Sequence, residues 1–233
     1  MPILAAPWPN RCAICAAPSR GRLQRVCTDC SARFAAPRRR CTGCALGLPA
    51  PAGPRCGRCL HEPPPWTSAI AALDYAYPWD RLLATLKFHD GLDLLPWATA
   101  TLADAVGAIG GVTGAERVLP VPLAAPRLRE RGYNQAWELA RGVAAARALP
   151  AGAGWLERLI DTPHQLALPR AQRVANMRGA FAVTPLGREA LAGRRVALVD
   201  DVLTTGATLA EATRTLLAAG AAEVEVWVLA RTG

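Results

Sequence analysis

From residue 63 onward, short apolar runs alternate with longer segments in which apolar positions recur every three or four residues. The short runs predict β-strands, which we place at residues 69–77, 116–121, 155–160, 181–183, 196–200 and 224–230. The longer segments predict helices, which we place at residues 79–88, 92–106, 134–149 and 208–219. Strands that alternate with helices of this length indicate an α/β fold built on a parallel sheet.

Residues 1–62 follow a different pattern, in which cysteines and turn-forming residues replace the apolar runs. Three consecutive prolines close this region before Trp66 and break regular structure. We therefore expect two domains, a duplicated zinc-ribbon region over residues 1–62 and an α/β domain over residues 63–233. The chain has no run of about 18 apolar residues, so no membrane span is expected. Its first residues do not resemble a secretion leader, which predicts a cytoplasmic protein.

The charge balance favours a polyanionic partner. Lysine and arginine together number 27 against 18 acidic residues, which gives a formal net charge of +9. Such a surplus suits nucleic acid or phosphorylated metabolites. Only Lys87 is a lysine, however, and alanine is abundant, so coding bias toward GC-rich codons is an alternative cause of the arginine content. The 52% of hydrophobic residues argues against a disordered chain.

Eight cysteines form a regular array near the N-terminus. A unit of two C-x-x-C pairs, separated by eleven residues, recurs 29 positions later in the chain. The candidate metal ligands are Cys12, Cys15, Cys27, Cys30, Cys41, Cys44, Cys56 and Cys59. Two C-x-x-C turns supply the four thiolates that a tetrahedral zinc ion needs, so we expect about two structural Zn²⁺ ions.

Alternatives to this metal assignment remain open at the level of sequence. A disulfide framework is usual for such cysteine densities in secreted domains, but no secretion signal accompanies it here. The repeat favours sequential sites, although a site that pairs Cys27 with Cys44 is sterically possible. Zinc ribbons also bind nucleic acid, so neighbouring arginines are either phosphate contacts or a solvated linker; they are Arg33, Arg38, Arg39 and Arg40.

The clearest signal for small-molecule chemistry is the segment RVALVDDVLTTGAT at residues 195–208. Its apolar run predicts a central strand buried on both faces, and ligands of open α/β sheets bind where such strands end. Asp200 and Asp201 suit a vicinal diol, or Mg²⁺ held indirectly, whereas the threonines, Gly206 and the following helix start suit a phosphate. A ribose 5-phosphate carries both groups. The structural alternative is an ordinary N-capped helix, which needs only one such polar residue.

These residues resemble the signature of type I phosphoribosyltransferases, which bind phosphoribosyl pyrophosphate (PRPP) with Mg²⁺. The resemblance implies that Asp200 and Asp201 are the catalytic carboxylates and hold the ribose hydroxyls. It assigns the 5-phosphate to Leu203, Thr204, Thr205, Gly206, Ala207 and Thr208.

The chain as a whole resembles the ComF family, which is associated with competence and gluconate utilisation. The landmarks are the cysteine array, the motif around Lys87, the stretch from Val121 to Gln135, and residues 165–181. The resemblance implies a type I phosphoribosyltransferase-like parallel sheet with an N-terminal zinc-ribbon region of four-cysteine sites. It also implies a link to DNA uptake.

The remaining candidate site residues belong to these landmarks. Val121 and Pro122 lie where the resembled fold binds pyrophosphate, and Arg127 and Arg131 follow in a segment that we expect to be a loop. Asn134 is expected to cap the next helix, with Gln135 supporting the turn. A mobile flap is expected near residues 164–170. Further substrate contacts are expected at Lys87, Gln165, Arg173 and Asn176, and His164 is either a proton donor or a solvated loop residue.

Two accounts of function follow. In the first, the chain transfers phosphoribosyl from PRPP to an unknown acceptor and releases pyrophosphate. In the second, the same fold senses a nucleotide or binds single-stranded DNA or DNA-uptake proteins without turnover. The sequence identifies neither the acceptor nor the oligomeric state.

Overall fold

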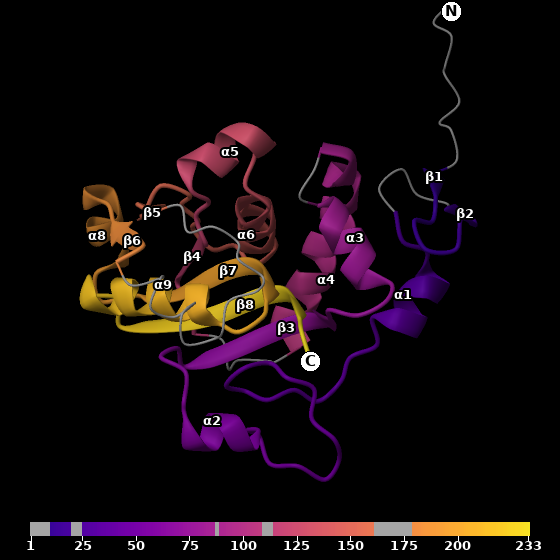
Figure 1. Cartoon of the computed structure of the whole chain (residues 1–233), viewed down its shortest axis with the longest axis horizontal. Helices are drawn as coiled ribbons and strands as arrows, with labels where there is room; N and C mark the ends of the chain where they lie inside the picture. Colours follow the sequence, from indigo (N-terminus) through magenta and orange to yellow (C-terminus); the bar gives the residue numbers. More distant parts are fainter. Residues whose placement is uncertain (1–9, 20–24, 87–88, 109–113, 161–178) are drawn as a thin grey trace, which may run out of the picture.

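A four-stranded parallel sheet forms the centre of the molecule (Figure 1). The computed structural model describes residues 10–19, 25–86, 89–108, 114–160 and 179–233. The strands lie in the order β3 (Ser68–Asp74), β8 (Glu223–Arg231), β7 (Arg195–Leu203) and β4 (Arg117–Pro120), and each neighbouring pair is parallel. The predicted α/β fold with a parallel sheet is therefore confirmed.

Alternating side chains of the sheet supply two hydrophobic cores, one on each face. On β7, Ala197 and Val199 face one core, whereas Val196 and Leu198 face the other. The first core is covered by α3 (Trp79–Thr85), α4 (Leu95–Ala108) and α6 (Gln135–Ala146). The second is covered by α9 (Ala207–Ala218) and α8 (Pro185–Leu191). Burial on both faces explains why the run before Asp200 is continuously apolar.

Two of the predicted strands belong to a separate sheet. The strands β5 (Leu156–Arg158) and β6 (Phe181–Val183) pair with each other in antiparallel fashion and lie beside the main sheet. Leu156 and Phe181 pack into the second core, so the apolar pattern correctly marked burial. It gave no information about which strands pair, because pairing depends on tertiary contacts.

Several segments differ from their expected secondary structure, among them α8, which was not expected from the sequence. The arginine-rich segment expected to be a loop forms the helix α5 (Ala125–Arg131), because its proline lies in the first turn, where the missing N–H costs nothing. Gly132, with φ of 76°, ends this helix. A 3₁₀ helix, η1 (His89–Leu94), precedes α4. The strand β7 continues beyond the predicted end, because Val202 and Leu203 still pair with Ala230 and Arg231 of β8.

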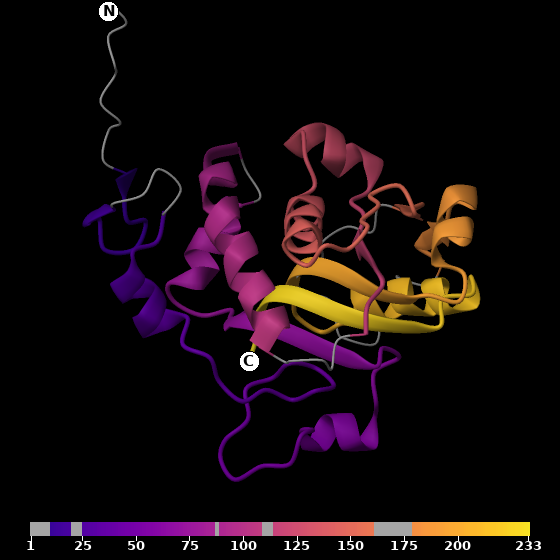
Figure 2. The same cartoon turned by 180° about the vertical axis from the view of Figure 1, so that it is seen from behind.

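The cysteine-rich region forms two small units that contact different parts of the α/β fold. We call them the first ribbon (residues 10–19 and 25–34) and the second ribbon (residues 41–61). The first contains the hairpin of β1 (Asn10–Arg11) and β2 (Pro18–Ser19) and the helix α1 (Thr28–Phe34), and the second ends in α2 (Gly57–His61). Figure 2 shows the two ribbons well separated, with the first beside α3 and the second below β3. The domain boundary at residue 62 stays a prediction.

Each ribbon packs into one of the two cores. Cys12, Val26 and Cys30 of the first ribbon share the core of Trp79, and Ala45 of the second ribbon shares the core of Trp66. The linker between the ribbons is held by Asp74, which pairs with Arg40 at 2.7 Å and also with Arg38. Within the parts of the chain that the structure describes, no helix is long and apolar enough to cross a bilayer.

Candidate functional site

The two adjacent carboxylates lie at the carboxyl end of β7, each oriented by the backbone. The Oδ1 atom of Asp200 accepts a hydrogen bond from the N–H of Asp201 at 2.9 Å, and Oδ1 of Asp201 accepts one from Val202 at 2.8 Å. Asp201 is 8% exposed, whereas Asp200 is half-buried. Both acids therefore lie near the carboxyl end of β7, which continues to Leu203, and Asp200 is more accessible to solvent than Asp201.

The loop after β7 leads into a helix whose first turn is not capped by a side chain of the described residues. Gly206 occupies the N-cap position of α9 with φ of 82°, a left-handed conformation that favours glycine. The hydroxyl of Thr205 lies 3.5 Å from the N–H of Ala207. This hydroxyl accepts a hydrogen bond from Ala207, so the other N–H groups of the first turn and the positive end of the helix dipole are the ones available to an anion.

The loop after β4 lies beside these acids because β4 and β7 are paired. Pro120 is in register with Val199, and the N–H of Val121 donates to the carbonyl of Val199 at 2.8 Å. Val121 and Pro122 are buried. The loops after the two strands thus lie at one edge of the sheet, as expected for a ligand site of an α/β fold.

Asn134 joins this loop to α6. Its Oδ1 accepts from the N–H of Ala136 at 3.0 Å, which confirms the predicted N-cap, and its Nδ2 donates to the carbonyl of Val121 at 3.0 Å. The side chain therefore fixes the helix start and the loop after β4 at once. Tyr133, next to it, donates its hydroxyl to the carbonyl of Leu86.

Gln135 has a larger part in the site than the sequence indicated. It is 5% exposed, and its Nε2 donates to Oδ2 of Asp201 at 3.4 Å, while Nη1 of Arg131 lies 3.3 Å from its Oε1. Arg131 and Arg127 are one turn apart on α5, not in a loop. The sequence shows only a glutamine next to a predicted N-cap residue, which does not indicate a contact with Asp201.

Several predicted contacts lie outside the described residues. They are Lys87, His164, Gln165, Arg173 and Asn176, together with the expected flap. The structure therefore tests neither the flap nor these side chains.

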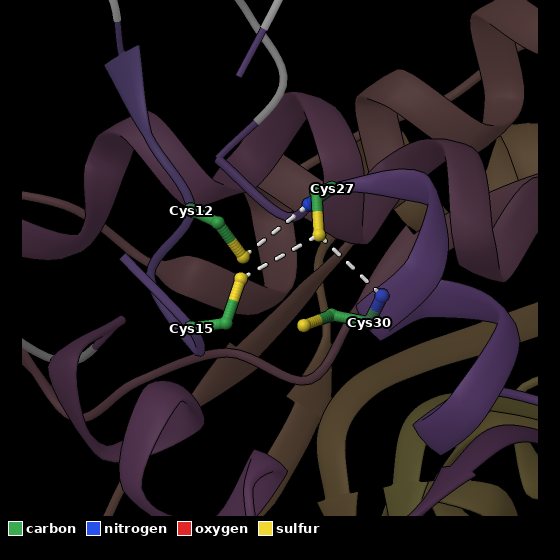
Figure 3. A group of neighbouring side chains, drawn as sticks. All are labelled: Cys12, Cys15, Cys27 and Cys30. Atoms are coloured by element: carbon green, nitrogen blue, oxygen red, sulfur yellow. Dashed lines mark hydrogen bonds between the residues drawn. The ribbon is translucent and has the colours of Figure 1, made fainter. Parts of the chain in front are cut away.

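The eight cysteines form two separate groups of four, as the repeat predicted. Cys12, Cys15, Cys27 and Cys30 make the first (Figure 3), and the second consists of Cys41, Cys44, Cys56 and Cys59. Within each group the ligand atoms lie within 4.8 Å of one another. The alternative that pairs Cys27 with Cys44 is therefore wrong.

The sulfur spacing fits a tetrahedral zinc ion. Four Zn–S bonds of about 2.3 Å require sulfur atoms about 3.8 Å apart. The Sγ atoms of Cys15 and Cys27 are 3.8 Å apart, and those of Cys44 and Cys56 are 3.7 Å apart. Both groups could therefore hold zinc with all four positions filled by protein, which suits a structural metal.

Backbone N–H groups stabilise one thiolate in each group. Burial raises the pKa of the Cys12 thiol, but N–H groups of Cys15, Cys27 and Ile14 outweigh it and lower that pKa to about 6. Burial likewise opposes the N–H groups of Cys56, Cys44 and Gly43, which lower the pKa of Cys41 to about 7. Zinc binds the thiolate form, so these N–H groups favour metal binding near neutral pH.

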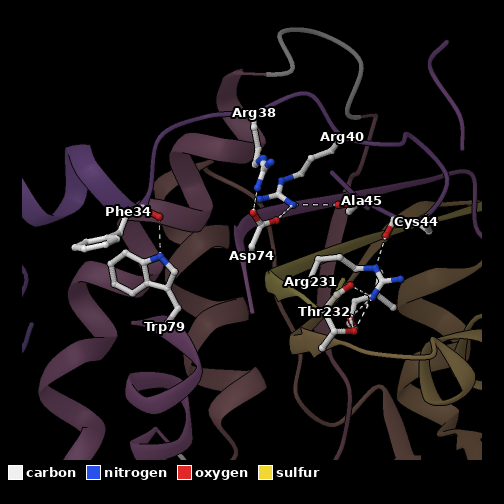
Figure 4. Close-up of polar contacts among 10 residues, drawn as sticks. Phe34, Arg38, Arg40, Cys44, Ala45, Asp74, Trp79, Arg231 and Thr232 are labelled. Atoms are coloured by element: carbon white, nitrogen blue, oxygen red, sulfur yellow. Dashed lines mark hydrogen bonds and ion pairs between the residues drawn. The ribbon is translucent and has the colours of Figure 1, made fainter. Parts of the chain in front are cut away.

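The arginines beside the ribbons divide into two kinds. Arg38 and Arg40 pair with Asp74 (Figure 4) and Arg39 donates to the carbonyl of Ala52. Burial raises the pKa of Asp74, yet hydrogen bonds and charge from Arg40 and Arg38 outweigh it and hold that pKa below its usual range. Arg33 instead lies 5.2 Å from the ring centre of Phe34 and is exposed. Of the four arginines, Arg33 is the best placed to contact an external phosphate.

Comparison with known proteins places this site in a family context. The family model described as a phosphoribosyl transferase domain matches residues 140–233. The DNA utilization protein YhgH of Shigella flexneri is 33% identical over 228 residues, which cover 96% of this chain and 98% of that protein. YhgH of Salmonella typhi is 32% identical over 237 residues, with 100% and 94% covered. Competence protein F of Haemophilus influenzae is 34% identical over 185 residues, with 76% and 78% covered.

The matched region includes both groups of four cysteines and the strand end with its two acids. The match to the phosphoribosyl transferase model covers β7 with its two acids, the turn after it, α9 and β8. The chain therefore belongs to the ComF family, with a phosphoribosyltransferase-type domain behind an N-terminal pair of four-cysteine ribbons.

Proposed function

We propose that this chain binds PRPP, or another ribose 5-phosphate compound, together with Mg²⁺ at the carboxyl end of β7. The observation that carries the proposal is the succession of Asp200 and Asp201 at a strand end and a glycine-capped helix immediately after it. The carboxylates suit the ribose hydroxyls, which donate hydrogen bonds. The helix start suits the 5-phosphate, which accepts them.

The pyrophosphate group of PRPP would lie over the loop after β4. Val121 and Pro122 begin this loop, and Asn134 holds it against α6. Arg131 and Arg127 on α5 supply positive charge nearby, and the guanidinium fork of arginine matches phosphate oxygens. Mg²⁺, when bound to the pyrophosphate oxygens, would neutralise part of their charge, with Asp200 and Asp201 as its indirect protein partners.

The reaction supported best is phosphoribosyl transfer. The bond between C1 of ribose and the pyrophosphate oxygen breaks, and its electron pair leaves with pyrophosphate. A nucleophilic atom of the acceptor forms the new bond to C1. The residues of this chain contribute chiefly by positioning the sugar and stabilising charge, so no strong general base is required of them.

Calorimetric titration with PRPP and Mg²⁺ tests the binding step. We expect saturable binding to the wild-type chain, and loss of that binding in the double variant Asp200→Asn with Asp201→Asn. The exposed Glu189 on α8 offers a matched control, and Glu189→Gln should bind like wild type. Equal binding by the double variant would contradict the proposal.

Pyrophosphate release, measured across candidate acceptors, tests turnover. Release that requires both an acceptor and the two aspartates supports transfer. Tight PRPP binding without release for any acceptor would support the alternative, a sensing module on the same fold.

A second candidate function, binding of single-stranded DNA, is favoured by an exposed cluster where α1 of the first ribbon meets the start of α3. The rings of Phe34 and Tyr77 meet edge to face at 6.1 Å, Tyr77 is 63% exposed, and Arg33 and Arg81 lie over these rings at 5.2 and 5.8 Å. Aromatic rings for base stacking beside arginines for phosphate are the usual elements of single-strand recognition. The names of the relatives, DNA utilization protein and competence protein F, agree with a place in DNA uptake or use.

Fluorescence anisotropy with a labelled oligothymidine tests this second function. Tyr77→Ala should weaken binding by about 1–3 kcal/mol, the value of one stacked base. Arg33→Ala should weaken it and also flatten its dependence on salt concentration. Arg188 of α8 is exposed and remote from the cluster, so Arg188→Ala is the control. Absent binding, or binding insensitive to salt, would remove the hypothesis.

A further inference from the structure

The second ribbon contacts the turn after β7 (residues 203–207), the proposed ribose-phosphate loop, through Arg231, the last residue of β8. This side chain is 7% exposed. Its Nε donates to the carbonyl of Cys44 at 2.9 Å, and its Nη1 donates to the carbonyl of Leu203 at 3.0 Å (Figure 4). Cys44 is a candidate metal ligand, and Leu203 directly precedes the Thr204–Gly206 turn. A single buried guanidinium therefore joins a group of four cysteines to the start of the loop.

Trp66 makes a second connection between the same two segments. Its ring is 7% exposed, and its Nε1 donates to the carbonyl of Gly43 at 2.6 Å, inside the second ribbon's first C-x-x-C turn. The other side of the ring faces Gly206, since a Cβ built there would lie 3.0 Å from Cη2 of Trp66. The ring thus fills the space between the C-x-x-C turn and the helix cap.

A small hollow confirms that ribbon and loop share a surface. It has a volume of about 130 Å³, and its wall includes Cys44 and Cys59 on one side and residues 203–207 on the other. The carbonyls of Gly43 and Cys44 can receive these hydrogen bonds only while the C-x-x-C turn keeps its shape. That shape depends on the cysteine group, where the N–H of Cys56 donates to Sγ of Cys41 at 3.2 Å.

The first ribbon provides an internal comparison, because it packs elsewhere. Its Cys12, Val26 and Cys30 lie in the core of α3 and α4, and Arg25 pairs with Asp93 of η1 at 2.8 Å. Figure 1 shows this ribbon beside α3, on the side of the molecule away from α9. The two copies of the repeat therefore contact different parts of the fold.

We propose that Arg231 and Trp66 are positioning residues that couple the metal state of the second cysteine group to the ribose-phosphate loop. This inference rests on the proposed function, because it assigns a further role at the same site. Metal in the second group would fix the backbone of Gly43 and Cys44, whose carbonyls bind Trp66 and Arg231. These two side chains in turn contact Gly206 and Leu203 of the loop. Coupling between two sites is reciprocal, so ligand at the loop must also stabilise metal in the second group.

The first test compares matched cysteine variants of the full chain. Cys44→Ser and Cys15→Ser should each lower the zinc content by about one ion. Hydrogen exchange at the amides of residues 204–209 should accelerate at least tenfold in Cys44→Ser and stay within twofold of wild type in Cys15→Ser. PRPP–Mg²⁺ affinity should follow the same pattern. Equal effects of the two variants on the loop would overturn the inference.

The second test addresses the two linking side chains without removing a ligand. Trp66→Phe keeps a ring against Gly206 but loses the N–H that binds Gly43. Arg231→Met removes the hydrogen bonds to the carbonyls of Cys44 and Leu203, along with the one to the neighbouring Thr232. We expect saturating PRPP–Mg²⁺ to slow the transfer of one zinc ion from the wild-type chain to a chelator, and each of these variants should lose that effect. The exposed Arg188→Met serves as the control for a lost arginine. Undiminished protection of zinc in a folded Trp66→Phe variant would also overturn the inference.

The readouts separate this inference from the proposed function. If the wild-type chain fails to bind PRPP, the proposed function is wrong, while the exchange rates of residues 204–209 still test the coupling. If PRPP binds but Cys44→Ser affects neither exchange nor affinity, the proposed function stands and the coupling is wrong.

Discussion

At the scale of single residues, the site depends on polar side chains that orient one another. Asp201 accepts from Val202 and from Gln135, and Gln135 in turn contacts Arg131. Asn134 supports the neighbouring loop in the same way. A carboxylate held by such partners needs little rearrangement when a ligand arrives, which is how a preorganised site stabilises charge.

Gln135 offers the sharpest residue-scale prediction. Gln135→Leu removes the amide that orients Asp201, so PRPP–Mg²⁺ affinity measured by calorimetry should fall about tenfold, as expected for a hydrogen bond to a charged group of about 1.5 kcal/mol. Gln135→Glu places a second carboxylate beside Asp201, so its PRPP–Mg²⁺ affinity should fall further than that of Gln135→Leu. This loss of affinity should shrink as the pH falls, because protonation of the new carboxylate removes the repulsion. The exposed Ala145 on α6 provides the control Ala145→Gln. Wild-type affinity in Gln135→Leu would show that the contact has no role in binding.

At the scale of elements, β7 and α9 define the site because the strand ends where the helix begins. Only Thr204 and Thr205 separate β7 from the Gly206 cap. A turn this short aims the start of the helix at the end of the strand. In the proposed complex, the 5-phosphate would face the helix start while the hydroxyls of the same ribose would face the carboxylates.

Replacing the cap glycine tests this turn. Gly206→Ala meets both a φ of 82° and the ring of Trp66, so we expect it to lower the free energy of unfolding by about 1–2 kcal/mol and to weaken PRPP binding. Gly220, at the other end of α9, has φ of 102° but open space around it. Gly220→Ala should therefore lower stability by a similar amount, in urea unfolding, without a change in affinity. Equal affinities for the two variants would argue against a phosphate site at this cap.

At the scale of the whole molecule, two cores on opposite faces of one sheet hold the domain and both ribbons together. Each ribbon contributes to a different core, so the repeat is not two interchangeable copies.

One acid is buried within this assembly and away from the site. Glu225 is 4% exposed and accepts hydrogen bonds from the N–H of Gly114 and from Nε1 of Trp227.

Glu225 predicts how stability depends on pH. Burial raises the pKa of Glu225 despite the two N–H donors, so the native state holds a proton more tightly than the unfolded state, whose pKa is about 4.3. Protonated Glu225 stabilises the native state fully below the pKa of the unfolded state. This stabilisation is lost as the pH rises through the higher pKa of the native state. The free energy of unfolding of Glu225→Gln, minus that of wild type, should therefore increase from pH 4.5 to pH 7 in urea titrations. A difference independent of pH would contradict this account, and the exposed Glu189→Gln, which does not act on Glu225, serves as the control.

How much of this could be predicted from the sequence depends on the range of the contacts. The 29-residue repeat was enough to group the cysteines correctly, and an apolar run before Asp200 marked the central strand. The segment that became α5 was misassigned because a proline in a first helical turn looks like a loop signal. The contacts of Arg231 with Cys44 and of Gln135 with Asp201 span 187 and 66 positions, and only the folded chain brings such residues together.

The most direct test of the central claim is a crystal structure of the full chain with PRPP and Mg²⁺. The account predicts the 5-phosphate within hydrogen-bond distance of the N–H groups at the start of α9, and the ribose hydroxyls facing Asp200 and Asp201. Pyrophosphate should lie over the loop that begins at Val121. PRPP bound at any other place, with the turn after β7 in contact only with protein, would contradict it.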